Sequence, residues 1–201
     1  PVMGPKPRKA QQIEVDALVR LAGQVLTHRG NAQGYFHDSG KAEALRDILI
    51  VGTSAGGARA KAVIAWNRAT NEVRSGQIAA GAGFEYWLLK FDGVAGNKDK
   101  ELEDPQGYGA IEFAYHLMAQ AAGIAMSECR LLEENGRRHF MTRRFDRDGN
   151  RKHHMQTLCA LAHLDFNQLA THDYAQWFMA ARDLGLGDEA PRQIFARAAF
   201  N

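Results

Sequence analysis

The fold of this chain is decided by the stretch Ile48-Leu-Ile-Val-Gly-Thr-Ser-Ala-Gly-Gly-Ala-Arg-Ala-Lys-Ala-Val-Ile-Ala-Trp66. An apolar, β-branched run over residues 48–51 enters a turn of small residues over 52–60. A second apolar run over residues 62–66 leaves this turn, with Lys61 at its head. The pattern predicts a strand, a glycine-rich loop and a second strand.

The glycine-rich loop is a candidate cradle for phosphate. Glycine has no Cβ, so at Gly52, Gly56 and Gly57 the backbone can come close to an anion and turn its N–H groups toward it. A P-loop is excluded because Ala58 stands where a lysine must follow the last glycine, and the spacing is not that of a dinucleotide fingerprint. A hairpin turn that is merely rich in glycine explains the stretch equally well.

Composition narrows the class of protein. The chain has 201 residues, of which 45% are hydrophobic, enough for one cored domain or two small lobes. A net charge of +2 gives no broad polyanion-binding signature, so direct binding to nucleic acid is not expected. No apolar run approaches ~20 residues and no leader pattern opens the chain, so we expect a cytoplasmic protein without membrane contact. Cys129 and Cys159 lack metal-ligand spacing and are expected to be free.

The remaining periodicity predicts a mixed first part and a helical second part. Strands are expected over residues 72–77, 84–91, 127–133 and 138–143. Helices are expected over residues 11–28, 108–122, 155–163, 172–184 and 189–201. Asn135-Gly136 is the strongest short-range hairpin signal, whereas residues 145–150 are expected to form a solvated turn and not a calcium loop.

Two charged residues stand out within these elements. Lys90 lies at the end of an aromatic, apolar strand. Its ammonium group could reach solvent from an edge strand, or it could bind an anionic partner. Glu112 lies one step round from the apolar helical face of Ile111, Tyr115 and Met118. A glycine loop, a strand lysine and a helix glutamate, in this order, are what kinase-type phosphoryl transfer requires.

Four motifs together carry a family resemblance. They are Ser54-Ala-Gly-Gly-Ala-Arg-Ala-Lys61, the Lys90 strand, Ile111-Glu-Phe-Ala-Tyr115 and above all Arg144-Phe-Asp-Arg147. With them the chain resembles, from about residue 48 to 201, the HipA family of serine/threonine kinases, the toxins of HipBA-type toxin–antitoxin modules. The resemblance implies an α+β fold with a protein-kinase-like, β-rich nucleotide-binding lobe. It divides the chain into an N-terminal arm and helices (1–46), the ATP-binding lobe (47–147) and the beginning of an all-helical lobe (148–201).

The resemblance also implies roles for individual residues. Those that would contact ATP phosphates are Gly56, Gly57, Ala58, Arg59, Ala60, Lys61 and Lys90. Glu112 would position Lys90, and a hinge of Arg143, Arg144 and Phe145 would meet adenine. Ser54 stands where another copy of the kinase phosphorylates the family's loop. Arg143 replaces a Glu of some members, and Arg59-Ala60 replaces the Gln-Glu of others.

The implied cofactors are ATP and Mg²⁺. The implied partners are a protein substrate, such as an aminoacyl-tRNA synthetase, and a HipB-like antitoxin. The family's Asn-x-Asp-x-His-x-Lys-Asn catalytic loop does not occur in the sequence, and the last helix has no C-terminal stop signal. We therefore expect a truncated fragment that is inactive by itself, and assign no catalytic residue.

Two alternatives stay open. A catalytically dead kinase-like module would bind an antitoxin or another protein, and a structural α+β domain would carry its glycine loop by accident. The run His163-Leu-Asp-Phe-Asn167 imitates a catalytic His-x-Asp, but its Asn follows the Asp too closely to reach a metal. Asp165 is expected to be a cap or turn residue.

Overall fold

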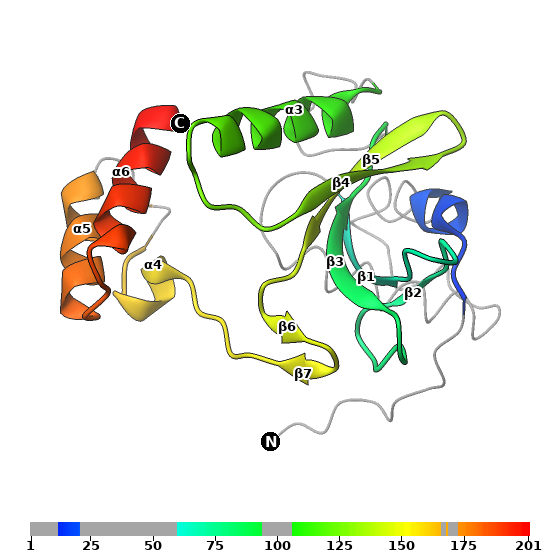
Figure 1. Cartoon of the computed structure of the whole chain (residues 1–201), viewed down its shortest axis with the longest axis horizontal. Coiled ribbons are helices and arrows are strands. Elements are labelled where there is room, and N and C mark those ends of the chain that lie inside the picture. The colour runs from blue at the N-terminus through cyan, green and yellow to red at the C-terminus, as the bar shows by residue number, and fades with distance from the viewer. Residues whose placement is uncertain (1–11, 21–59, 94–105, 166–167, 169–172) are drawn as a thin grey trace. The chain divides into compact units, whose positions relative to one another are not determined.

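A computed structural model of the chain describes residues 12–20, 60–93, 106–165, 168 and 173–201 (Figure 1). The chain divides into two compact units, which are taken in turn. The sheet unit consists of residues 1–114 and 127–152, and the helical unit consists of residues 115–126 and 153–201.

The sheet unit is built on five antiparallel strands in the order β2-β1-β3-β5-β4. The strands are β1 (Lys61–Trp66), β2 (Val73–Ser75), β3 (Glu85–Lys90), β4 (Cys129–Glu134) and β5 (Arg137–Arg143). Each was predicted from the sequence, and the ends differ by no more than about two residues. The strand predicted over residues 48–51 lies outside the described residues.

Two hairpins show how turn chemistry shapes this unit. Asn135 (φ 47°) and Gly136 (φ 76°) both have positive φ between β4 and β5, as a two-residue type I′ turn requires. The hairpin prediction is therefore confirmed. Residues 145–150 were predicted to form a turn, and residues 145–146 and 149–150 do so. Between these turns lies β6 (Arg147–Asp148), which pairs with β7 (Arg151–Lys152) in a second small sheet. Gly149, with φ 52°, supplies the left-handed conformation between them.

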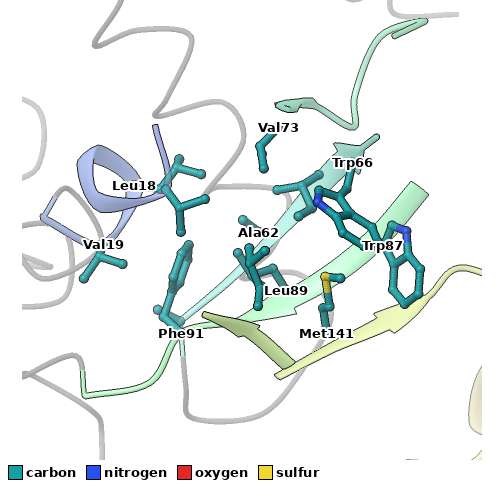
Figure 2. Close-up of a cluster of buried hydrophobic side chains, with 13 residues drawn as sticks. Leu18, Val19, Ala62, Trp66, Val73, Trp87, Leu89, Phe91 and Met141 are labelled. Carbon is teal, nitrogen blue, oxygen red and sulfur yellow. The ribbon is translucent and has the colours of Figure 1, made fainter. Parts of the chain in front are cut away.

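The apolar core of the sheet unit lies on one face of the sheet (Figure 2). Trp87 and Leu89 of β3 share this face with Met141 of β5, because Leu89 is paired with Met141 and side chains alternate along a strand. Leu18 and Val19, from the helical residues 15–20, belong to the same cluster.

The first predicted helix begins later than expected. Residues 15–20 are helical, but Gln12 forms an isolated bridge with Arg74 of β2. A residue bonded to a strand edge has extended backbone and cannot at the same time begin a helix. The remainder of the predicted helix, residues 21–28, lies outside the described residues.

Helix α3 (Tyr108–Ala121) occupies the predicted range but turns a different side inward. Ile111, Tyr115 and Met118 are 51%, 57% and 55% exposed. The buried positions are Gly109, His116 and Ala119. A small residue lets a helix approach a sheet closely, and a Cβ on Gly109 would lie 1.9 Å from the carbonyl oxygen of Arg138. Close approach therefore decides which face of α3 is buried.

The helical unit contains α4 (Leu158–Leu161), α5 (Tyr174–Asp183) and α6 (Glu189–Phe200). Helices were predicted at these three places. Helix α4 begins later than expected because Thr157 caps it, and it ends before His163, whose φ of 54° is not helical. Side chains of α6 bond the segment after α3: Gln193 Nε2 donates to the Gly123 carbonyl (3.2 Å) and Arg197 Nη2 to the Ala125 carbonyl (2.5 Å). The Asp165 carbonyl accepts a bond from the Gln168 N–H (3.1 Å), as a turn residue should.

Two further sequence predictions concern cysteine and membrane. Cys129 and Cys159 are both free thiols, as predicted. Within the described ranges, no helix combines the length and the apolar composition needed to cross a bilayer.

Candidate functional site

The candidate site centres on an ion pair between β3 and α3. The Nζ atom of Lys90, the last residue of β3, lies 2.5 Å from Oε2 of Glu112 on α3. Both side chains are only partly exposed, and the Lys90 ammonium also lies 5.6 Å from the ring centre of Phe140. A charge-assisted hydrogen bond of this kind is stronger than a neutral one. The structure thus brings together two residues that the sequence assigned to one site.

A second lysine lies opposite Lys90. In the β1–β3 ladder Lys61 is the direct partner of Lys90, so both side chains project from the same sheet face. Like charges directly opposite each other destabilise an antiparallel pair. Glu112 offsets part of this repulsion through its hydrogen bond to Lys90. The strand register thus places two lysine side chains and a glutamate at the same end of this sheet face.

The face that carries the lysines continues along the strands. Two residues before Lys90, Leu88 projects from the same side, and its ladder partners are Val63 on β1 and Thr142 on β5. In this row Val63 is fully buried, whereas Leu88 and Thr142 are partly buried. Val63, Leu88 and Thr142 were not singled out from the sequence, because their common face depends on the strand order β1-β3-β5.

The three predicted hinge residues differ in their contacts and in their exposure to solvent. Arg143 is paired with Trp87 and therefore projects from the sheet face opposite to Lys90, with its Nη2 3.6 Å from Oε1 of Glu85. The backbone N–H of Arg144 donates to the Tyr86 carbonyl at 2.9 Å. The side chain of Phe145 is 75% exposed.

The Arg-Phe-Asp-Arg run holds the end of β5 against β3. Arg144 binds Asp146 through two hydrogen bonds, Nε–Oδ1 at 2.7 Å and Nη2–Oδ2 at 2.5 Å, and these bonds hold the pKa of Asp146 below its ordinary value. The Arg147 guanidinium lies 5.0 Å from the ring centre of Tyr86, whose hydroxyl donates to Asn150 Oδ1 at 2.7 Å. This motif therefore has a structural role within the sheet unit.

Much of the predicted phosphate loop falls outside the described residues. Ser54, Gly56, Gly57, Ala58 and Arg59 belong to this part of the chain. Ala60 is buried, and its carbonyl accepts a bond from the N–H of Phe91 at 3.2 Å. Lys61 begins β1 and is also buried. The loop thus enters the sheet beside the end of β3.

Asp92 was not predicted to be a site residue, but the structure places it at the start of α3. Its carboxylate accepts hydrogen bonds from the N–H groups of Gly107 and Gly109, where α3 begins. In the sequence, Asp92-Gly93 looks like an ordinary turn after a strand. Asp92 and Gly107 are 15 residues apart, so no local sequence pattern indicates that they are in contact.

Comparisons with known proteins agree with the motif-based resemblance. The family described as HipA-like C-terminal domain matches residues 53–201, a range that contains Lys61, Lys90, Glu112 and the Arg144–Arg147 run. Comparisons with curated proteins and with solved structures give no match. Because the family match extends over more than half of the chain, this chain belongs to the HipA-like family.

Proposed function

We propose that this chain is the ATP-binding portion of a HipA-like serine/threonine protein kinase. The observation that carries the proposal is the Lys90–Glu112 ion pair between β3 and α3. In protein kinases, a strand lysine contacts the α- and β-phosphates of ATP, and a helix glutamate holds that lysine in place. Membership in the HipA-like family supports the same assignment.

The charges around Lys90 suit a polyphosphate. Lys61 and Lys90 project from one face, and Glu112 binds Lys90 between β3 and α3. Glu112 orders the flexible Lys90 side chain before ligand binds, which lowers the entropy cost of binding. ATP would place its phosphates at this cationic end, and its base would lie near the partly buried side chains of Leu88 and Thr142.

The substitution at Arg143 is compatible with this assignment. Its side chain projects from the face opposite to Lys90, so its charge does not lie on the proposed nucleotide face. The proposed adenine contacts of the hinge would then come from the backbone of residues 143–145. The described residues contain no group of three or more His, Cys, Asp or Glu able to hold a metal, so we derive no step through Mg²⁺.

The proposal includes partners of the whole protein. A kinase of this family would transfer phosphate to a serine or threonine of a protein substrate, and a HipB-like antitoxin would be its binding partner. Ser54 would be a site of regulatory phosphorylation. These assignments follow from family membership and the motifs at residues 54–61.

A calorimetric titration with Mg-ATP tests the proposal. We expect Lys90→Ala to weaken binding by tenfold or more, because a charged hydrogen bond contributes about 1.5–3 kcal/mol. Glu112→Gln should weaken it less, since Lys90 remains. Lys152→Ala is the matched control, because it removes the same charge from β7, where Lys152 Nζ lies 3.5 Å from the Gln77 carbonyl.

The titration also decides between the kinase and its alternative. If folded wild-type protein does not bind Mg-ATP, or if Lys90→Ala binds it as tightly as wild type, the ATP assignment is wrong. A kinase-like module that binds an antitoxin or another protein would then be the better account.

A further inference from the structure

We infer that Asp92 is a positioning residue, which holds the start of α3 so that Glu112 meets Lys90. Strand β3 and the segment directly after it would then hold α3 at two points, through Lys90 at Glu112 and through Asp92 at the helix N-terminus. The effect of Asp92 on nucleotide binding rests on the proposed function. Its effect on the ion pair can be measured without any nucleotide.

The contacts of Asp92 are those of a buried helix cap supplied from another segment. The residue is 3% exposed. Its Oδ1 and Oδ2 each lie 3.0 Å from the Gly107 amide nitrogen, and Oδ1 lies 3.2 Å from that of Gly109. The first N–H groups of a helix have no partner within the helix, and a negative charge there is favoured by the helix dipole. The Asp92 carboxylate meets both requirements.

Asp92 is itself fixed in place. Its backbone N–H donates to Nδ1 of His139 at 2.9 Å, and His139 is fully buried on β5. The ring of Phe91 meets the His139 ring edge-on at 5.8 Å between centroids. The carboxylate therefore projects from a rigid part of the sheet.

The start of α3 also has little freedom to move toward the sheet. A Cβ on Gly109 would lie 1.9 Å from the Arg138 carbonyl oxygen, so the helix already lies against the backbone of β5. Two forces thus define the position of the helix: contact with β5 prevents closer approach, and the hydrogen bonds of Asp92 prevent separation.

A shift at the start of α3 is transmitted to the ion pair. Glu112 follows Gly109 by three residues, about one helical turn or 4.5 Å along the axis. Lys90 and Asp92 are separated on their side by the single buried residue Phe91. Because a hydrogen bond weakens steeply with distance, a displacement of about 1 Å would separate Glu112 from Lys90. Asp92 therefore acts on the site through Glu112.

Carbodiimide coupling tests the geometry directly. A water-soluble carbodiimide joins a carboxylate to an amine in contact with it, and mass spectrometry of peptides measures the Lys90–Glu112 amide formed. We expect Asp92→Ala to lower the yield several-fold, and Asp92→Asn to restore part of it because the amide oxygen can still accept one N–H. Asp148→Ala, which removes an exposed aspartate from β6, should leave the yield unchanged.

Titration with Mg-ATP then tests the functional effect. Asp92→Ala should weaken binding about two- to fivefold, and no more than Glu112→Gln does, because it acts through Glu112. Combined with Glu112→Gln, it should weaken binding no further than Glu112→Gln alone, because two changes that act through one contact are not additive. If Asp92→Ala does not fold, Asp92→Asn takes its place in both measurements.

The two measurements separate the inference from the proposed function. An unchanged coupling yield in folded Asp92→Ala, or fully additive losses of affinity in the double variant, would overturn the positioning role. If the yield falls in Asp92→Ala but wild-type protein does not bind Mg-ATP, the positioning role stands and the proposed function fails.

Discussion

The sheet unit and the helical unit bury their apolar side chains to very different extents. In the sheet unit, Trp87, Leu89 and Met141 are fully buried. In the helical unit, large apolar side chains such as Leu186 and Phe195 are exposed, and its helices depend on caps such as the Asp173–Gln176 capping box of α5. The sheet unit therefore has its own apolar core, whereas the described part of the helical unit relies more on helix caps and on polar contacts such as those of Gln193 and Arg197.

The largest expected difference comes from one substitution made in both units. Leu89→Ala removes a side chain that is 0% exposed and should lower the free energy of unfolding by about 2–5 kcal/mol. Leu186→Ala, at a position that is 51% exposed, should change it by no more than about 0.5 kcal/mol. Hydrogen exchange followed by mass spectrometry measures the two units separately. Equal losses of protection would contradict the comparison.

A second pair of variants tests how closely α3 packs against the backbone of β5. Gly109→Ala would place a Cβ 1.9 Å from the Arg138 carbonyl oxygen, so α3 must move away from β5. We expect a loss of about 1–3 kcal/mol, as for other overpacked positions, and a lower yield of Lys90–Glu112 coupling.

Gly187→Ala, before α6, is the matched control. A Cβ there meets nothing within 4 Å, so the change should be neutral or slightly stabilising. Thermal unfolding of the two variants measures the difference. An unaltered melting temperature for Gly109→Ala would show that α3 can move at little cost.

What could be predicted from the sequence depended on local patterns. The strand ending at Lys90 and the Asn135-Gly136 hairpin were predicted correctly, because an aromatic run bounded by glycines and a pair of turn residues are both local signals. The order of Lys90 and Glu112 along the chain also pointed to their proximity. The positions of apolar residues did not predict which face of α3 is buried, because the small Gly109 is buried and the apolar Ile111 is exposed.

Contacts between distant segments could not be predicted. Asp92 caps a helix that begins 15 residues later, and no local pattern distinguishes it from an aspartate in a turn. The pairing of Lys61 with Lys90 likewise depends on the β1–β3 register, which is defined only after the sheet has formed. The proximity of Lys90 and Glu112 was thus predicted from the sequence, but the contacts that position them were not.

The buried His139 predicts that the sheet unit loses stability in mild acid. Burial lowers the pKa of His139 to about 4, although the Asp92 carboxylate acts in the opposite direction. Between this value and the unfolded value of about 6.5, the unfolded chain binds more protons, so stability falls as the pH decreases. From pH 7 to pH 5 the loss due to this one group is about 2 kcal/mol.

Glu134 opposes this effect and must be removed to isolate it. Its Oε2 lies 3.9 Å from Nε2 of His139, and burial raises its pKa, so its protonation in acid favours the folded state. In the Glu134→Gln variant, urea unfolding at pH 7 and pH 5 should show the full loss of about 2 kcal/mol in the free energy of unfolding. Adding His139→Asn should remove this change of the free energy of unfolding with pH. If stability still fell between pH 7 and pH 5 in that double variant, His139 would not be the cause.

The smallest expected difference concerns ion pairs at the surface. Arg68 binds Glu128 through two hydrogen bonds and Glu85 through a third at 2.7 Å, and its guanidinium lies 5.7 Å from the ring centre of Trp87. Hydrogen bonds from Arg68 lower the pKa of Glu128 to about 2, so this stabilisation is present above pH ~4.5 and is lost as the pH falls toward 2.

Glu128→Gln should lower the stability of the sheet unit by about 0.2–1 kcal/mol, and by less at 1 M salt, where exposed charges are screened. Asp183→Asn breaks the exposed Arg182–Asp183 pair of α5 and should have no measurable effect. Urea unfolding of both variants at low and high salt makes the comparison. Suppose that Asp183→Asn lowered the free energy of unfolding as much as Glu128→Gln. The aromatic rings and the second carboxylate around Arg68 would then not strengthen its ion pair, and this surface network would not stabilise the sheet unit.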